Sequence, residues 1–274
     1  MTTRSATTTA PRPAGGARER AAIAAKTLRT DRWWFAPVIT VIGLGAWVTY
    51  ATVRVFMHDF YWVQEYHYLT PFYSPCVTQA CIPEAAHFGR ILPGWWIIPD
   101  AALTLPFLLL FRLTCYYYRK AYYRSFWLSP PACAVPDGHQ SYSGETRFPL
   151  LFQNAHRYTF YAAVVISLIN SWDAILAFNG ENGFGLGLGN LILLGNVVAL
   201  WAYTISCHSC RHIVGGRLKH FSKHPVRYRA WGFVSALNGR HMQLAWITLG
   251  TLAFTDFYIM ALSAGWFGDL RFIN

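Results

Sequence analysis

The sequence predicts an all-α protein whose five helices form a bundle across a membrane, and two observations support this. The chain is 54% hydrophobic and only 13% charged, whereas an ordinary soluble domain has about 25% charged residues. A membrane-spanning helix needs about 20 mostly apolar residues, and five segments meet that requirement. They lie near residues 34–57, 95–115, 158–178, 187–209 and 241–264.

The N-terminal segment, residues 1–32, differs in composition from the rest of the chain. Its start is rich in Thr, Ala, Pro and Gly, a composition typical of disorder. Residues 18–32 favour a short basic amphipathic helix on the membrane surface. We therefore expect a disordered and basic segment ahead of a five-helix membrane domain at residues 33–274.

The distribution of positive charge predicts the orientation of the bundle. Residues 1–33 carry seven Lys and Arg, residues 112–157 carry six, and residues 207–240 carry seven. Cytoplasmic loops of membrane proteins collect such cations, so we expect the N-terminus in the cytoplasm and the C-terminus outside. The net charge of +11 lies between apolar spans, which indicates lipid or a soluble partner and no nucleic acid.

Charged residues inside the predicted spans need partners. Buried charges in a membrane are costly, and they pair with one another or mark a functional path. We expect Arg54 to pair with Asp100 or Asp173 and so to hold helices together. A proton path from the outer surface, including Asp256, is the weaker alternative.

Two cysteines, Cys76 and Cys81, lie in the predicted outer loop at residues 58–94. Cysteines outside the cytoplasm can oxidise, so their spacing predicts a disulfide that closes a small loop. The alternative is a metal site that includes one of the histidines His58, His67 or His87.

The densest set of metal-binding residue types is Cys207-His208-Ser209-Cys210-Arg211-His212, where the fourth span ends. The predicted topology brings the inner ends of four spans to this membrane edge, which also collects Cys115, His156 and His241. Ionisable groups at such an edge are costly unless they have a function, so we interpret the constellation as a candidate metal site. Cys133 lies in a Pro-rich cytoplasmic loop, and the sequence gives no role for it.

Helical spacing narrows the candidate ligands. If residues 207–212 stay helical, Cys207 and Cys210 share one face, whereas the two histidines of this segment share a face about 150° away. One small metal centre could not use both pairs. The favoured Cys2His2 set is therefore Cys207, Cys210, His156 and His241, with His208, His212 and Cys115 as alternates.

A Cys2His2 set fits three metal centres, and the residues alone leave all three open. Zinc would be tetrahedral and structural. A Rieske-type [2Fe–2S] cluster places two cysteines on one iron and two histidines on the other. Haem b would use two histidines from facing helices and ignore the cysteines. The competing interpretation is that the cysteines pack in the bundle without any metal, as free cysteines often do.

The overall pattern resembles a known family over residues 30–270. The chain has five predicted spans, an inside N-terminus, no soluble domain and histidines at helix ends. Its Arg-, Ala- and Thr-rich start, Trp33-Trp34-Phe35 at the entrance of the first span, and Cys207 to His212 at the end of the fourth add to this. It resembles the single-subunit membrane anchor of succinate dehydrogenase/fumarate reductase (complex II), in its actinobacterial form.

The resemblance implies a subunit of an enzyme that is not catalytic alone. In this family the anchor holds a soluble flavoprotein subunit and an iron–sulfur subunit on the cytoplasmic face of the bacterial plasma membrane. Electrons run from succinate through FAD and iron–sulfur clusters to quinone in the respiratory chain. The oligomeric state of the complex stays open, a higher oligomer included.

The resemblance also bears on the metal centre. Many five-span anchors carry two b haems, each held by two histidines inside the bundle, but this chain has no histidine in the interior of a predicted span. The actinobacterial branch implies a membrane-embedded Rieske-type [2Fe–2S] cluster instead, and haem b stays the alternative.

A quinone site needs an apolar slot and donors to the two carbonyl groups of the quinone. The inner membrane edge supplies aromatic rings and cations from several helix ends. We expect the quinone head among Trp33, Trp34, Arg112, Tyr116, Arg119, Arg157 and Tyr158. Interfacial aromatic belts and Arg or Lys anchors produce the same residue types, which is the competing explanation.

Two other classes of function remain as alternatives. A transporter would need a polar pathway through the bundle, and the lack of an evident repeat counts against it. A zinc-stabilised membrane protein would have no redox role. Identification of the metal would distinguish the transporter and the zinc-stabilised protein from the redox subunit.

Overall fold

The computed structural model describes residues 29–78, 82, 91–137 and 150–274. Most of the predicted N-terminal segment lies outside these ranges. The chain divides into two compact units, residues 1–42 with 120–142, and residues 43–119 with 143–274. The membrane domain expected at residues 33–274 stays a prediction, and each unit is described by itself.

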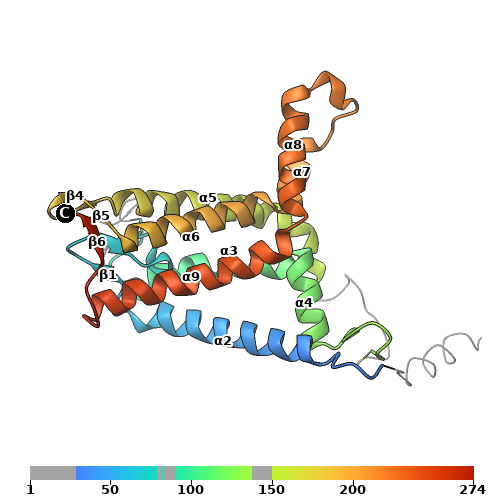
Figure 1. Cartoon of the computed structure of the whole chain (residues 1–274), viewed down its shortest axis with the longest axis horizontal. Coiled ribbons are helices and arrows are strands. Elements are labelled where there is room, and N and C mark those ends of the chain that lie inside the picture. Colours follow the sequence, from blue (N-terminus) through green and yellow to red (C-terminus); the bar gives the residue numbers. More distant parts are fainter. Residues whose placement is uncertain (1–28, 79–81, 83–90, 138–149) are drawn as a thin grey trace, which may run out of the picture. The chain divides into compact units, whose positions relative to one another are not determined.

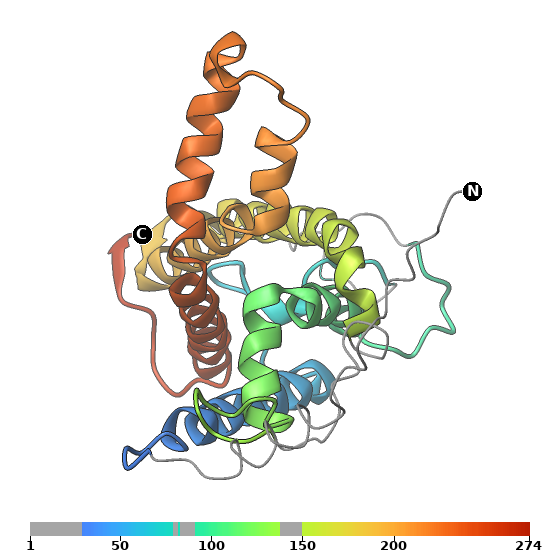
Figure 2. The ribbon, with the colours of Figure 1, turned by 90° about the vertical axis from the view of Figure 1, so that its right-hand side faces the viewer.

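The described chain is mostly helical (Figures 1 and 2). Its longer helices are α2 (Phe35–Met57), α3 (Asp100–Thr114), α4 (Tyr116–Phe126), α5 (His156–Leu176), α6 (Leu188–Ile205), α7 (His208–Gly215), α8 (Pro225–Asn238) and α9 (His241–Ser263). Short 3-10 helices are η1 (Pro71–Tyr73), η3 (Leu150–Ala155) and η4 (Phe221–Lys223). The boundary between the units falls inside α2 and inside α4.

Four helices of the described chain, α2, α5, α6 and α9, are long and apolar enough to cross a membrane. They confirm four of the predicted spans. The segment predicted at 95–115 is helical only from Asp100, and its 15 residues rise about 22 Å, less than the roughly 30 Å of a hydrocarbon core. Pro99 caps this helix and drives the residue before it out of the helical region. A fifth crossing by α3, and the orientation of the bundle, stay predictions.

Three short antiparallel strand pairs depart from the all-α prediction. They are β1 (Trp62–Val63) with β2 (Tyr68–Leu69), β3 (Asn179–Gly180) with β4 (Gly183–Phe184), and β5 (Leu186–Gly187) with β6 (Arg271–Ile273). Figure 1 shows strands of these pairs at the end of the bundle that holds the C-terminus, whereas α7 and α8 leave the opposite end. The two ends of the bundle are thus built differently.

The bundle of the second unit has an apolar interior and an apolar outer surface. Helix α6 packs against both α5 and α9, and α3 packs against α5. Small and branched side chains such as Ala163, Leu193 and Ile259 fill the interior. Large apolar side chains such as Leu168 and Val198 point outward and are more than half exposed. Such an outer surface suits contact with lipid tails, as expected of membrane-spanning helices.

Arg54 forms a buried ion pair with Asp256, so the pairing with Asp100 or Asp173 that we expected is wrong. Its Nε atom lies 2.7 Å from Oδ2 of Asp256, and both side chains are at most 2% exposed. A second nitrogen, Nη2, donates to Oδ1 of the same carboxylate at 3.2 Å. Tyr50 donates its hydroxyl to this carboxylate at 2.6 Å. The pair joins α2 to α9 across the bundle.

The first unit holds the start of α2 and the end of α4. Arg29 forms an ion pair with Asp31, and its Nη1 donates to the backbone carbonyl of Cys133 at 2.9 Å. This contact ties the segment before α2 to the segment after α4. Cys133 itself is an exposed free thiol.

Candidate functional site

A pocket of about 960 Å³ opens at the end of the bundle where α7 leaves it. Six side chains of the predicted constellation line it. Four of them come from separate helix ends: His156 at the start of α5, His241 at the start of α9, Cys115 between α3 and α4, and Cys207 between α6 and α7. The structure thus brings four separate helix ends together, as the topology predicted. The volume lies in the range of small-molecule sites.

His156 is held at both ring nitrogens. The hydroxyl of Thr114 donates to the carbonyl of Leu110 at 2.6 Å, so its oxygen accepts from Nδ1–H of His156 at 2.8 Å. This assigns the tautomer whose Nε2 carries a lone pair. That Nε2 lies 3.0 Å from the sulfur of Cys207. Phe111 stacks on the imidazole with ring centroids 4.9 Å apart.

His241 is held in the same way by a different pair of helix ends. The hydroxyl of Ser206 donates to the carbonyl of Tyr203 at 2.7 Å and accepts from Nδ1–H of His241 at 2.7 Å. The lone pair on Nε2 faces the sulfur of Cys115 at 3.4 Å. Tyr203 stacks on this imidazole with centroids 5.0 Å apart.

The two histidines are held by two chain segments that have the same sequence pattern. Residues 111–115 read FRLTC and residues 203–207 read YTISC, so both place an aromatic residue, a hydroxyl and a cysteine at the same spacing. Each segment gives its ring and hydroxyl to one histidine and its thiol to the other. Our sequence reasoning missed Thr114 and Ser206, and this repeated pattern is the signal that could have found them.

Of the predicted ligand pair Cys207 and Cys210, only Cys207 lies at the pocket. Helix α6 ends at Ile205, and Cys207 is the N-cap of α7 with an extended backbone. The continuous helix that we assumed over residues 207–212 is therefore interrupted, and Cys210 is not among the described residues that line the pocket. Cys115, an alternate in the prediction, is the second cysteine at the histidines.

The environment of Cys207 keeps its free thiol protonated. Burial raises the pKa of this thiol to about 12, and the neighbouring Cys115 also raises the pKa. The thiol can therefore donate its proton to the lone pair on Nε2 of His156. Its sulfur accepts from the backbone N–H of Ser209 at 3.4 Å. Binding to a metal would replace the thiol proton.

The donors form two Cys–His pairs and not one tight group. Among the residues that the structure describes, no three His, Cys, Asp or Glu side chains are gathered as a site for a single metal ion. The stacked rings bring the two pairs together, because Phe111 and Tyr203 contact each other with centroids 5.7 Å apart. The four donors are therefore arranged as two Cys–His pairs that are linked through these rings.

Arg112, predicted at the quinone site, lies beside the pocket and not in its lining. Its guanidinium contacts the rings of Trp47, Tyr118 and Tyr203 at 5.6, 5.3 and 5.1 Å. None of the described ion pairs involves it. Because Tyr203 stacks on His241, only the ring of Tyr203 separates the positive charge of Arg112 from this histidine.

Three of the predicted quinone residues, Tyr116, Arg157 and Tyr158, do line the pocket. Arg119 stands behind them: its guanidinium lies 4.9 Å from the ring of Tyr116, and it donates to Gln153 of the lining at 2.6 Å. The pocket lining thus carries phenol and guanidinium donors.

The remaining predicted residues are placed as follows. His208 and His212 line the pocket near its exposed surface, and Arg157 donates to Nδ1 of His212 at 2.8 Å. Trp33 and Trp34 belong to the first unit, where Trp34 is exposed.

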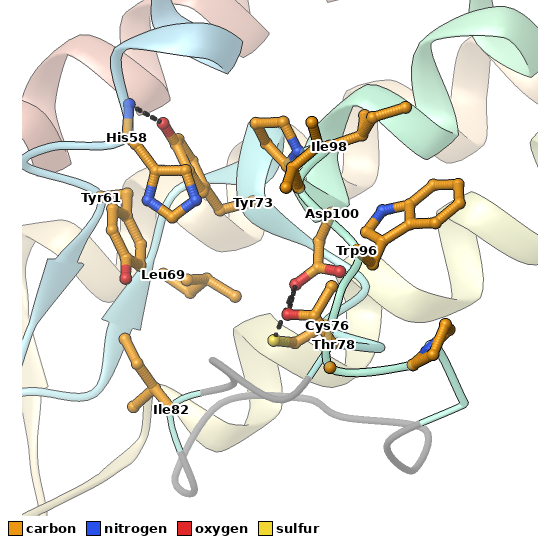
Figure 3. A pocket seen from close by; sticks show the side chains of 14 residues that line it. His58, Tyr61, Leu69, Tyr73, Cys76, Thr78, Ile82, Trp96, Ile98 and Asp100 are labelled. Carbon is orange, nitrogen blue, oxygen red and sulfur yellow. Dashed lines mark hydrogen bonds between the residues drawn. The ribbon is translucent and has the colours of Figure 1, made fainter.

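A smaller pocket of about 170 Å³ lies among residues 58–100 (Figure 3). Asp100 borders it and accepts from the hydroxyl of Thr78 at 3.0 Å. Cys76 also borders it and takes part in a disulfide. Its predicted partner Cys81 lies outside the described residues, as does His87, so that pairing stays a prediction.

Residues 35–265 match the family model of the actinobacterial succinate dehydrogenase subunit SdhC. Among solved structures, the chain is similar to a chain of the Mycobacterium smegmatis Sdh1 complex in the apo form, with 66% sequence identity and a TM-score of 0.85. That alignment covers 91% of this chain and 95% of the other. The search of curated proteins gave no match.

Proposed function

Because the chain belongs to the actinobacterial SdhC family, and is therefore a membrane anchor of succinate dehydrogenase, we propose that it carries electrons to quinone. The electrons would come from an iron–sulfur subunit that docks, with a flavoprotein subunit, at the end of the bundle where the pocket opens. They would pass through a Rieske-type [2Fe–2S] cluster held by Cys115, Cys207, His156 and His241.

The main support for this proposal is that the four donors form two Cys–His pairs, in which each segment gives its hydroxyl to one histidine and its thiol to the other. A [2Fe–2S] cluster takes two protein ligands on each of two irons, and the Rieske form uses two cysteines and two histidines. The pocket offers two thiols and two imidazole lone pairs, in two pairs that touch through stacked rings. The residues present therefore fit such a group in number and chemical type.

The surrounding residues keep the donors in the form that binds iron. Thr114 and Ser206 accept from the Nδ1–H groups, so both Nε2 atoms stay free of protons and face the thiols of Cys207 and Cys115. The backbone N–H of Ser209 donates to the sulfur of Cys207, a contact that stabilises negative charge on that sulfur. When bound, such a cluster takes up and releases single electrons at a higher potential than an all-cysteine cluster.

The other metal centres that the sequence left open fit this geometry less well. Zinc in a structural site takes four ligands around one ion, whereas the described donors form two pairs. Bis-histidine haem needs both Nε2 atoms to face one iron. Here the Nε2 atoms of His156 and His241 face thiols from other helix ends, at 3.0 and 3.4 Å.

The same pocket supplies what a quinone head needs. Tyr116, Tyr158 and Arg157 line it, and their hydroxyl and guanidinium groups are donors that can hold the quinone carbonyls. Gln153, fixed by Arg119, adds an amide. These residues would orient the quinone next to the donors of the cluster, so that electrons have a short path.

Spectroscopy of the purified complex tests the proposal. We expect iron and acid-labile sulfide beyond that of the soluble subunits, no haem absorption, and a reduced-state EPR signal whose average g value lies below that of the free electron. His156→Ala and His241→Ala should each remove this signal and quinone reduction, but leave succinate oxidation by a soluble dye intact. A b-type haem spectrum, or zinc at this site, would overturn the cluster and retain only the anchor.

A further inference from the structure

Helices α7 and α8 form a hairpin that projects from the bundle. Figures 1 and 2 show both helices running across the direction of α5, α6 and α9. Two residues separate the end of α6 from the hairpin, and two residues separate the hairpin from the start of α9. Both of its arms therefore leave from the level where membrane-spanning helices end, which is the level of the lipid headgroups.

Internal contacts fix the two arms to each other. The guanidinium of Arg211 lies 4.9 Å from the ring of Trp231, and its Nε donates to the hydroxyl of Ser235 at 2.9 Å. Arg227 donates to the backbone carbonyls of Val214 and Gly216 at 2.9 and 3.2 Å. Two of the cations in the hairpin are thus used to build it.

The other cations of the hairpin point outward. Arg217, Lys219, Lys223 and Arg229 are exposed, and residues 207–240 contain no Asp or Glu. The hairpin therefore presents a positive surface with no acid of its own to neutralise it.

Apolar side chains share the outer surface of α8 with Arg229, and Lys223 lies two residues before this helix begins. Val226 is 76% exposed and Phe233 is 60% exposed. They are seven residues apart and so lie on one face of the helix. Val234, on another face, is buried. Helix α8 thus has a second apolar face that nothing in the described chain covers.

We propose that the exposed face of α8 lies in the headgroup layer of the membrane, where Lys223 and Arg229 bind the phosphates of anionic phospholipids. An exposed apolar stripe flanked by cations is the pattern of helices that lie in a membrane interface. Anionic headgroups attract each nearby cation by about 1 kcal/mol. The level at which the hairpin leaves the bundle, and its direction across the spans, put this face where lipid is available.

Spin labels in the complete complex test the position of this face. We would label Val226→Cys and Phe233→Cys, each in a Cys133→Ser background, in nanodiscs that contain phosphatidylglycerol. Val198→Cys in the middle of α6 gives the lipid reference, and Asn182→Cys in the β3–β4 turn gives the aqueous reference. We expect collisions with oxygen to dominate at 226 and 233, as at 198. Collisions with a water-soluble nickel complex, as at 182, would overturn the proposal. So would shielding from both reagents, which would mean that another subunit covers the face.

Lipid retention tests the role of the charges. Native mass spectrometry of the complex should show phosphatidylglycerol bound to the unaltered protein. In the double variant Lys223→Gln/Arg229→Gln the apparent affinity should fall roughly 25-fold, because two such cations act together. Lys120→Gln, an exposed cation outside the hairpin, should change nothing. Equal retention by all three proteins would overturn the proposal.

Discussion

The Nε2 atom of His156 lies 3.0 Å from the sulfur of Cys207, although 51 residues separate them in the chain. The matching contact, between Nε2 of His241 and the sulfur of Cys115, is 3.4 Å. In both, the other ring nitrogen bonds to the hydroxyl that directly precedes the opposite cysteine. Each of the two helix ends therefore contacts both histidines, so a change in one helix end should disturb both of them.

The hydroxyl of Thr114 should matter for metal retention. In Thr114→Val the Nδ1–H of His156 loses its acceptor, and the ring can turn or change tautomer. Loss of such an outer partner typically weakens metal binding by about 10-fold to 100-fold. Challenge of the complex with a chelator, followed by iron analysis, should show faster loss of iron. Thr114→Ser keeps the hydroxyl and should behave as the unaltered protein, and equal loss in both variants would contradict this role.

Arg112 should raise the reduction potential of the proposed cluster. Its guanidinium is a fixed cation one ring away from His241, and a nearby positive charge favours the form that has gained an electron. We expect Arg112→Gln to lower the midpoint potential in an EPR-monitored redox titration. Arg119→Gln, whose guanidinium lies against Tyr116, serves as the control and should shift it less. An unchanged midpoint in Arg112→Gln would show that the cation has no such effect.

The ion pair between Arg54 and Asp256 should be structural. Asp256→Asn would leave Arg54 buried without its counter-charge, and removal of one member of a buried pair typically costs about 3–5 kcal/mol. The melting temperature of the complex should fall clearly, while turnover per folded complex stays the same. Asp59→Asn is a matched control, since only the backbone carbonyl of Asp59 contacts Arg54. A loss of turnover without a loss of stability would favour a role in proton transfer instead.

Two glycines of α6 should respond differently to the same substitution. A Cβ atom at Gly189 would lie 2.2 Å from Cε2 of Tyr68, whereas one at Gly195 would meet nothing within 4 Å. Gly189→Ala should therefore destabilise the protein by about 1–3 kcal/mol, and Gly195→Ala should be neutral or slightly stabilising. Thermal unfolding of both variants checks this, and a similar effect from both would mean that the contact with Tyr68 is not tight.

The positions of the long helices could be predicted from the sequence because membrane spans depend on length and composition alone. α2, α5, α6 and α9 match the predicted segments closely. The gathering of His156, His241 and Cys207 also followed from topology, since alternate helix ends meet at one membrane edge. These properties need no knowledge of side-chain packing.

The finer geometry of the site depends on features that helical periodicity does not contain. We assumed one helix through residues 207–212, but α7 begins only at His208, and Cys210 does not line the pocket. The partner of Arg54 was missed for a related reason, because which helix faces α2 is decided by packing. The paired segments 111–115 and 203–207 did contain a usable signal, which a comparison of the chain with itself at short range would detect.

The most direct test of the account is the comparison of Cys115→Ser with Cys210→Ser in the purified complex, by reduced-state EPR and iron analysis. Cys115 contacts His241 at 3.4 Å, whereas Cys210 does not line the pocket. We predict that Cys115→Ser abolishes the signal of the membrane cluster and that Cys210→Ser retains it. Retention of the signal in Cys115→Ser with its loss in Cys210→Ser would contradict the donor set proposed here.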